Sequence, residues 1–245
     1  MVLKVLGSSS AGNCYILENE SEALILEAGI RFPEVERAMN FNVGKIDGCL
    51  ISHEHSDHAG QILSFPRFVD VFCSRGTADK IDAGEKSKMH AVSANTPFEA
   101  GRFRIIPFAT KHDAAEPLGF YINHPETGNV LFATDTSYLP RRFSGLNNIL
   151  IEANYRMDIL EENVRNGSVH HAQCNRTLQS HMSYATCLDA LLANDLSQVN
   201  SIILIHLSDR NSSAEEFRQG ICEATGKNVS VAEKGMIMDF NKTPF

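Results

Sequence analysis

Short apolar runs separated by polar turns dominate the first 150 residues and predict β-strands. The predicted strands span residues 2–6, 13–17, 23–27, 48–51, 69–73, 103–108, 118–122, 130–133 and 149–152. Helical patterns between them are short, over residues 33–39, 59–63 and 77–81. Residues 82–96 are polar and turn-rich, and we predict a loop there.

After residue 152 the pattern becomes helical, with predicted helices over 157–166 and 184–193, a buried strand over 201–206 and a helix over 212–225. Ser212 and Glu215 have the spacing of a capping box at the start of that last helix. Two further strands are predicted near residues 229 and 236. Two runs of β-hairpins, each followed by helices, indicate two packed sheets with helices outside, a four-layer α/β/β/α sandwich. Without repeats or a linker, residues 1–245 are predicted to form a single domain.

One polar stretch stands out, the six residues from His53 to His58 that follow the apolar run 48–51. Its three imidazoles and the Asp57 carboxylate are poor packing material and good metal ligands. In an extended segment His53, His55 and Asp57 would share one face, with His58 at the turn. The stretch predicts a metal-binding loop.

Composition sets the context for this loop. The chain is 43% hydrophobic and 21% charged, as in ordinary globular proteins, and its formal charge of −8 argues against a broad basic surface that tracks many phosphates. The six cysteines form no C-x-x-C pair and predict buried, reduced thiols. No apolar run approaches the length of a membrane span, so we expect a cytoplasmic protein without a membrane partner.

A binuclear centre needs about six or seven protein ligands, so more are expected outside the loop. His206 ends the most apolar strand, and His112 and Asp135 likewise follow predicted strands. For His206 a satisfied core histidine is the alternative, and for Asp135 a turn or helix cap. We expect the remaining histidines, His90, His124, His170 and His171, at the surface.

The order of these residues resembles that of the metallo-β-lactamase superfamily. The similarity is narrower to its WalJ/YycJ-type branch, which comprises DNA exonucleases related to tRNase Z and to the phosphodiesterases of phosphonate breakdown. The segments that carry this second similarity are residues 7–13, 112–120, 134–136, 180–183 and 206–208. The resemblance runs from residue 2 to about residue 211 and implies the metallo-β-lactamase fold.

The resemblance also implies a ligand set. His53, His55 and His112 would hold one metal ion, Asp57, His58 and His206 the second, and Asp135 would bridge them. An acidic residue rather than cysteine at the bridging position favours phosphodiester over β-lactam chemistry. The chain departs from the family at Glu27, where an aspartate is usual. The longer side chain can still accept a hydrogen bond from a ligand histidine, or else Glu27 is a surface residue at a strand end.

The implied mechanism is hydrolysis by a hydroxide that bridges two divalent metal ions, zinc or alternatively manganese. Asp57 would orient this hydroxide as well as bind metal, and His181 would donate a proton to the leaving oxygen. A histidine that caps the following helix is the alternative for His181. Ser9, Asn13 and Arg210 are weaker candidates for substrate contacts, with turn and loop roles as the alternatives.

The sequence leaves several functions open. A phosphodiesterase or nuclease that acts on DNA in the manner of an exonuclease is the first hypothesis. A phosphodiesterase for small or cyclic nucleotides, a lactone or thioester hydrolase, and a non-catalytic nucleic-acid-binding or metal-binding module are the others. Only 46 positions separate Asp135 from His181, too few for the large second domain of the ribonuclease J relatives. A homo-oligomer is compatible with the sequence.

Overall fold

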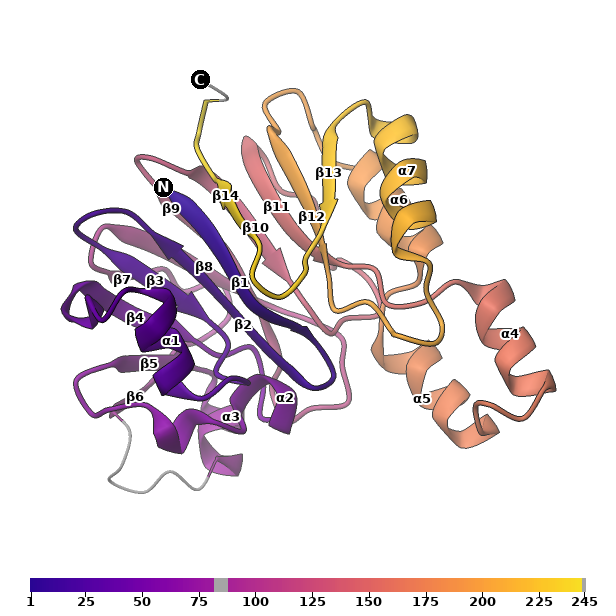
Figure 1. Ribbon diagram of the computed structural model, residues 1–245, viewed down its shortest axis with the longest axis horizontal. Coiled ribbons are helices and arrows are strands. Elements are labelled where there is room, and N and C mark those ends of the chain that lie inside the picture. The colour runs from indigo at the N-terminus through magenta and orange to yellow at the C-terminus, as the bar shows by residue number, and fades with distance from the viewer. Residues whose placement is uncertain (82–87, 244–245) are drawn as a thin grey trace.

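The computed structural model describes residues 1–81 and 88–243, which form two seven-stranded sheets packed face to face (Figure 1). The first sheet has the order β14 (Ile237–Asp239), β1 (Val2–Ser9), β2 (Gly12–Glu18), β3 (Ala23–Leu26), β4 (Ile46–Leu50), β5 (Asp70–Cys73) and β6 (Lys88–Ala91). The second has the order β13 (Asn228–Val231), β12 (Ser201–Ile205), β11 (Leu146–Glu152), β10 (Gly128–Ala133), β9 (Leu118–His124), β8 (Phe103–Ala109) and β7 (Phe98–Ala100).

Helices cover the outer faces of both sheets. On one side are α1 (Phe32–Ala38), α2 (Ser56–Ala59) and α3 (Arg75–Lys80), and on the other α6 (Tyr184–Leu192) and α7 (Ala214–Thr225) (Figure 1). Helices α4 (Met157–Arg165) and α5 (His171–Ser180) lie apart from these layers at the lower right of the figure. The predicted four-layer sandwich is therefore confirmed. Within the described ranges no helix is long and apolar enough to span a bilayer.

Alternation along the strands explains the layering. Tyr15 and Leu17 of β2 pack in the core between the sheets, whereas Cys14 and Ile16 pack against the helices outside. Strand β12 does the same with Ile203 and Ile205 inside and Ile202 and Leu204 outside. Strands buried on both faces read as continuous apolar runs, which is why the sequence identifies them readily. All six cysteines are free thiols, four of them buried.

Two local expectations were wrong, and one helix, α5, lies where the sequence predicts no element. Part of the predicted loop 82–96 is strand β6, which pairs with β5, while residues 82–87 lie outside the described ranges. The capping box is absent: Ser213 precedes α7 without a capping bond from its side chain, and the Ser212 hydroxyl instead donates to the Ser208 carbonyl at 2.7 Å.

Strand direction determines where the candidate ligands meet. Strands β8, β10, β11 and β12 run the same way, since β9 is antiparallel to both of its neighbours and the others pair in parallel. Their carboxyl ends therefore share one edge of the second sheet. His112, Asp135 and His206 follow three of these ends, and the His53–His58 loop follows β4 of the other sheet.

Close backbone contacts fix that loop at Gly29. A Cβ atom added there would overlap the carbonyl oxygen of Asp57 and lie 2.5 Å from the Asn13 nitrogen. We predict that Gly29→Ala lowers the free energy of unfolding by about 1–3 kcal/mol, or the melting temperature by about 2–12 °C, because backbone atoms must move apart. Gly44→Ala is the matched control, since no heavy atom lies within 4 Å of its added Cβ. Equal melting temperatures for the two variants would contradict this packing.

Candidate metal centre

The histidine loop is only partly extended. His53 and His55 lie in irregular backbone, while Asp57 and His58 belong to the single turn of α2. The expectation of a shared face for His53, His55 and Asp57 was therefore wrong. The change of backbone conformation sends the first two histidines to one group of side chains and Asp57 and His58 to another.

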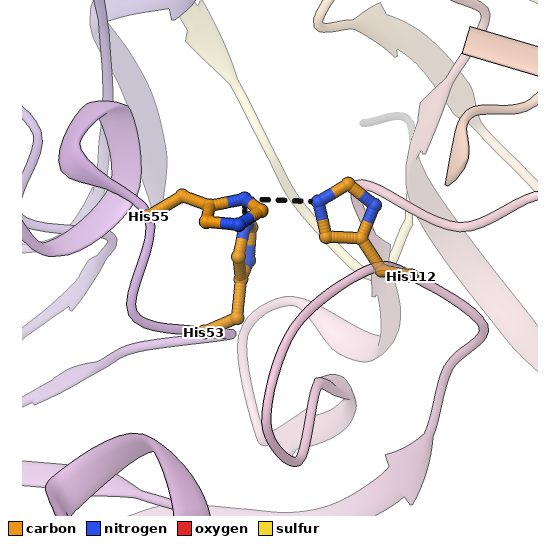
Figure 2. Close-up of side chains that lie close together, drawn as sticks. All are labelled: His53, His55 and His112. Carbon is orange, nitrogen blue, oxygen red and sulfur yellow. Dashed lines mark hydrogen bonds between the residues drawn. The ribbon is translucent and has the colours of Figure 1, made fainter. Parts of the chain in front are cut away.

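His53, His55 and His112 form the first group, which we term the histidine cluster (Figure 2). His55 Nδ1 lies 2.9 Å from His53 Nε2 and 3.1 Å from His112 Nε2. Tetrahedral ligands at about 2.0–2.1 Å from zinc stand about 3.3 Å apart. The converging nitrogens are therefore spaced for coordination of one cation.

Groups behind the rings fix how the histidine cluster presents its nitrogens. His112 Nδ1 donates to the Ser180 carbonyl at 2.8 Å, which leaves Nε2 as the unprotonated atom that faces the cluster. His53 Nδ1 lies 2.8 Å from the Ser52 hydroxyl. Burial lowers the pKa of both His53 and His112, so both rings favour the neutral form that binds metals.

Asp57, His58 and His206 form the second group, which we term the mixed cluster. Asp57 Oδ2 lies 3.2 Å from His206 Nε2 and 3.3 Å from His58 Nε2. Burial alone would lower the pKa of His206, but the Asp135, Asp57 and Glu152 carboxylates raise it to about 10. The carboxylates around this cluster thus stabilise positive charge within it.

Asp135 stands between the two clusters with one oxygen toward each. Its Oδ2 lies 3.4 Å from His112 Nε2, and its Oδ1 lies 3.2 Å from His58 Nε2 and 3.4 Å from His206 Nδ1. The Thr134 hydroxyl donates to Oδ1 at 2.7 Å and fixes the carboxylate plane. This is the position that a bridging ligand would occupy.

Charge balance agrees with the ligand geometry. Four carboxylates meet here, Glu27, Asp57, Asp135 and Glu152, and in the described part of the chain their ionic partners are all histidines. Charged groups out of water need compensation. The buried His and Asp clusters therefore fit a binuclear metal site, in which two divalent ions would offset four negative charges.

Glu27 and Asn13 lie behind the mixed cluster, and both are fully buried. Glu27 accepts the backbone N–H of Ser52 at 3.2 Å, and its Oε2 faces His58 Nδ1 at 3.6 Å. Asn13 Nδ2 lies 3.2 Å from His58 Nε2 and 3.3 Å from Asp57 Oδ2. Glu27 thus faces the ring nitrogen of His58 that points away from the mixed cluster. Asn13 contacts Asp57 and His58 directly and does not line the pocket wall.

Glu152 contacts both His181 and His206, and it is not among the candidate residues predicted from the sequence. Its Oε1 accepts from His181 Nδ1 at 2.7 Å and from His206 Nδ1 at 3.2 Å. Its Oε2 accepts the backbone N–H groups of Thr136 and Met182 at 3.0 and 3.1 Å. The signal was available, because Glu152 ends an apolar strand in the same way as Asp135.

His181 follows α5 as its C-terminal cap residue, and its ring stacks on that of His206 with centroids 5.4 Å apart. Since Nδ1 is bonded to Glu152, Nε2 is the nitrogen left for a ligand in the adjacent pocket. The Glu152 carboxylate raises the pKa of His181 despite the opposing effect of burial. His181 does not cap the next helix, α6, because the side chain of Ser183 caps it.

A pocket of about 440 Å³ opens onto both clusters. Its walls come from the ligands, from α5 and from the loop after β12, and its polar lining includes Ser10, Asn154, Gln173, Arg176, Arg210 and Asn211. Arg210, a candidate for substrate contact, lines this pocket. Ser9 differs, since its hydroxyl accepts the Ala11 N–H within its own turn and Ser10 lines the wall.

One of the four histidines that we expect at the surface, His124, lies in the interior instead. His124 is fully buried, with its ring 4.5 Å from that of Phe103 and its Nε2 3.1 Å from Glu22 Oε1. His170 and His171 are exposed as expected.

Three of the six non-glycine residues with positive φ in the described part of the chain lie at the centre. Glu27, Asp135 and His206 have φ angles of 69°, 41° and 54°, a region that non-glycine residues seldom adopt. Residues in such conformations cluster at functional sites, where surrounding contacts hold them. The His206 N–H, for example, donates to the Ser8 hydroxyl at 3.0 Å.

Comparison with known proteins agrees with this geometry. The chain is 28% identical to exodeoxyribonuclease WalJ of Streptococcus pneumoniae over 231 residues, 86% of this chain and 83% of the relative. It is 26% identical to exodeoxyribonuclease YycJ of Bacillus anthracis over 260 aligned positions, 96% of this chain and 93% of the relative.

Among solved structures, the metallo-β-lactamase-fold protein YhfI of Bacillus subtilis superposes with a TM-score of 0.71 at 15% identity, covering 97% of this chain and 98% of YhfI. A family model described as the beta-lactamase superfamily domain matches residues 29–207. The chain therefore belongs to the β-lactamase superfamily and has the metallo-β-lactamase fold.

Proposed function

We propose that this protein is a binuclear metal-dependent phosphodiesterase that acts on DNA in the manner of an exonuclease. The observation that carries the proposal is the Asp135 carboxylate, with one oxygen toward each cluster. The two relatives named as exodeoxyribonucleases, similar over most of the chain, support DNA as the substrate.

Both clusters have roles in this proposal. The histidine cluster would hold one ion, the mixed cluster the other, and Asp135 would contact both, with zinc as the expected metal and manganese as the alternative. A divalent pair at such a site supplies Lewis acidity toward a phosphoryl oxygen and makes water a nucleophile at neutral pH. Asp57 lines the pocket, where its carboxylate can accept a hydrogen bond from the attacking water and orient it.

The leaving oxygen needs a proton, and the pair of His181 and Glu152 is placed to supply it. Glu152 holds Nδ1–H at 2.7 Å, which orients the ring and favours its charged form. Nε2 then carries the proton toward the pocket. The same carboxylate oxygen bonds His206, so one buried residue positions a ligand and the proton donor together.

A small nucleotide is the second candidate substrate, because the pocket volume of about 440 Å³ is typical of small-molecule sites.

We predict that metal-loaded protein hydrolyses bis(p-nitrophenyl) phosphate and linear DNA, and that chelation to below one metal ion per chain abolishes both activities. The measurement pairs metal analysis with assays on DNA, RNA, cyclic nucleotides and a β-lactam. Turnover of the β-lactam alone would refute the phosphodiesterase proposal.

His181→Ala should lower kcat by about 10²-fold or more without changing the bound metal, since only proton donation is removed. His171→Ala is the matched control, because His171 is an exposed histidine at the start of the same helix. Metal analysis and steady-state kinetics on both variants test this. If His181→Ala loses metal in proportion to activity, His181 is a ligand instead.

Glu152→Gln should weaken metal binding and activity together, each by about 10–100-fold. Glutamine lacks the negative charge of Glu152, so its amide oxygen accepts more weakly from His181 and His206. A metal titration followed by calorimetry, with parallel kinetics, measures both effects. Glu223→Gln is the control, since Glu223 is exposed on α7. Wild-type metal affinity in Glu152→Gln would show that Glu152 does not position His206.

A further inference from the structure

Arg176 lies on the pocket wall formed by α5, one helical turn before Ser180. Its Nε donates to Asp113 Oδ2 at 2.7 Å, and Asp113 follows directly after His112. The guanidinium is thereby attached to the loop of a candidate metal ligand, although its side chain remains 59% exposed.

Only one edge of this guanidinium is occupied. Among the described residues, the terminal nitrogens of Arg176 have no hydrogen-bond partner, so several of its five donors remain available. An arginine held at Nε and open at its terminal nitrogens can bind a phosphate with two parallel hydrogen bonds.

The charges around the pocket are compatible with a phosphate bound by Arg176. Two divalent ions would balance the four carboxylates of the centre, which leaves no excess positive charge for a second phosphate. Within the described pocket lining the permanent cations are Arg176 and Arg210. Arg210 has the exposed Asp209 as its neighbour on the same loop and lies 3.5 Å from the Ser168 carbonyl. Arg210 belongs to the loop that follows His206, but of these two side chains only that of Arg176 is bonded to a residue directly beside a candidate ligand.

We propose that Arg176 binds a phosphate next to the scissile one, so that the site prefers a chain with at least two phosphates over an isolated phosphodiester. The proposal rests on the phosphodiesterase function proposed above and assigns its substrate class as an oligonucleotide or polynucleotide strand. Asp113 keeps the guanidinium at the wall before substrate arrives.

The test compares two chromogenic substrates that share one scissile bond. One is the p-nitrophenyl ester of thymidine monophosphate, and the other is the same ester of the dinucleotide, which adds one phosphate. Both are prepared in 5′ and 3′ forms to cover either strand direction. The variants are Arg176→Ala, Arg176→Lys and, as a matched control, Arg218→Ala.

Arg218 is a half-buried arginine on α7 whose side chain is 40% exposed, donates to Glu215 at 3.0 Å and lies outside the metal pocket. We expect wild-type protein to favour the dinucleotide in one of the two forms. Arg176→Ala should lower kcat/KM for that substrate by about 10–100-fold, mainly through KM, and far more than for the mononucleotide ester. Arg176→Lys should restore part of the loss, and Arg218→Ala should behave as wild type.

Equal losses on both substrates, with an unchanged melting temperature, would overturn the role of Arg176 and leave the phosphodiesterase function intact. Absence of turnover of either ester by metal-loaded wild-type protein would instead refute the phosphodiesterase function itself. A wild type that does not distinguish the two substrates would also overturn the preference for a second phosphate.

Discussion

Four carboxylates packed among histidines are the constraint on which the rest of the centre depends. Each carboxylate withdrawn from water costs several kcal/mol unless positive charge or hydrogen bonds replace its hydration. Asp135 and Glu152 are almost fully buried and have no lysine or arginine partner in the described part of the chain. The histidines would need to carry most of the compensating charge themselves, whereas two divalent ions compensate it and leave the imidazoles neutral.

Hydrogen bonds around the centre hold its residues in fixed positions. Glu27, Asp135 and His206 adopt left-handed backbone conformations, each at an expense of about 1–3 kcal/mol. Neighbouring groups hold them there: the Glu27 N–H donates to the Leu50 carbonyl at 2.8 Å, and Asn154 Nδ2 donates to the His206 carbonyl at 2.8 Å. Backbone strain is tolerated at these three residues because the side chains must reach the same small volume from different strands.

The sequence was most informative where burial and chemistry coincide. His112, Asp135 and His206 were identified because each follows an apolar run, and the structure brings all three to the His53–His58 loop. Glu152 is the last residue of an equally apolar strand, but the sequence marks it only as a strand end, since a lone glutamate in that position is usually solvated. The burial of Asn13 against His58 could not be predicted from the sequence, because the two residues are 45 positions apart and meet only in the folded chain.

Helix α5 shows why the second half of the chain was harder to interpret. Its buried residues, Thr177 and Ser180, are polar, so no apolar stripe indicates a helix. Together with α4 it packs around a small cluster of its own, Tyr155, Leu160 and Val169, beside the main core. Polar contacts join α4 to the loop after β12, where Asn163 of α4 donates to the Arg210 carbonyl at 2.8 Å.

This arrangement separates two tasks within one pocket. The sheets supply the candidate metal ligands from strand ends, whereas α5 supplies the wall that contains Gln173 and Arg176. The same helix accepts from His112 at the Ser180 carbonyl and ends at His181. A substrate that contacts α5 therefore contacts a helix that is hydrogen-bonded to a candidate ligand, His112, and to the proposed proton donor, His181. Changes on the outer turns of α5 can thus alter which substrate is bound while the strand ends keep the centre intact.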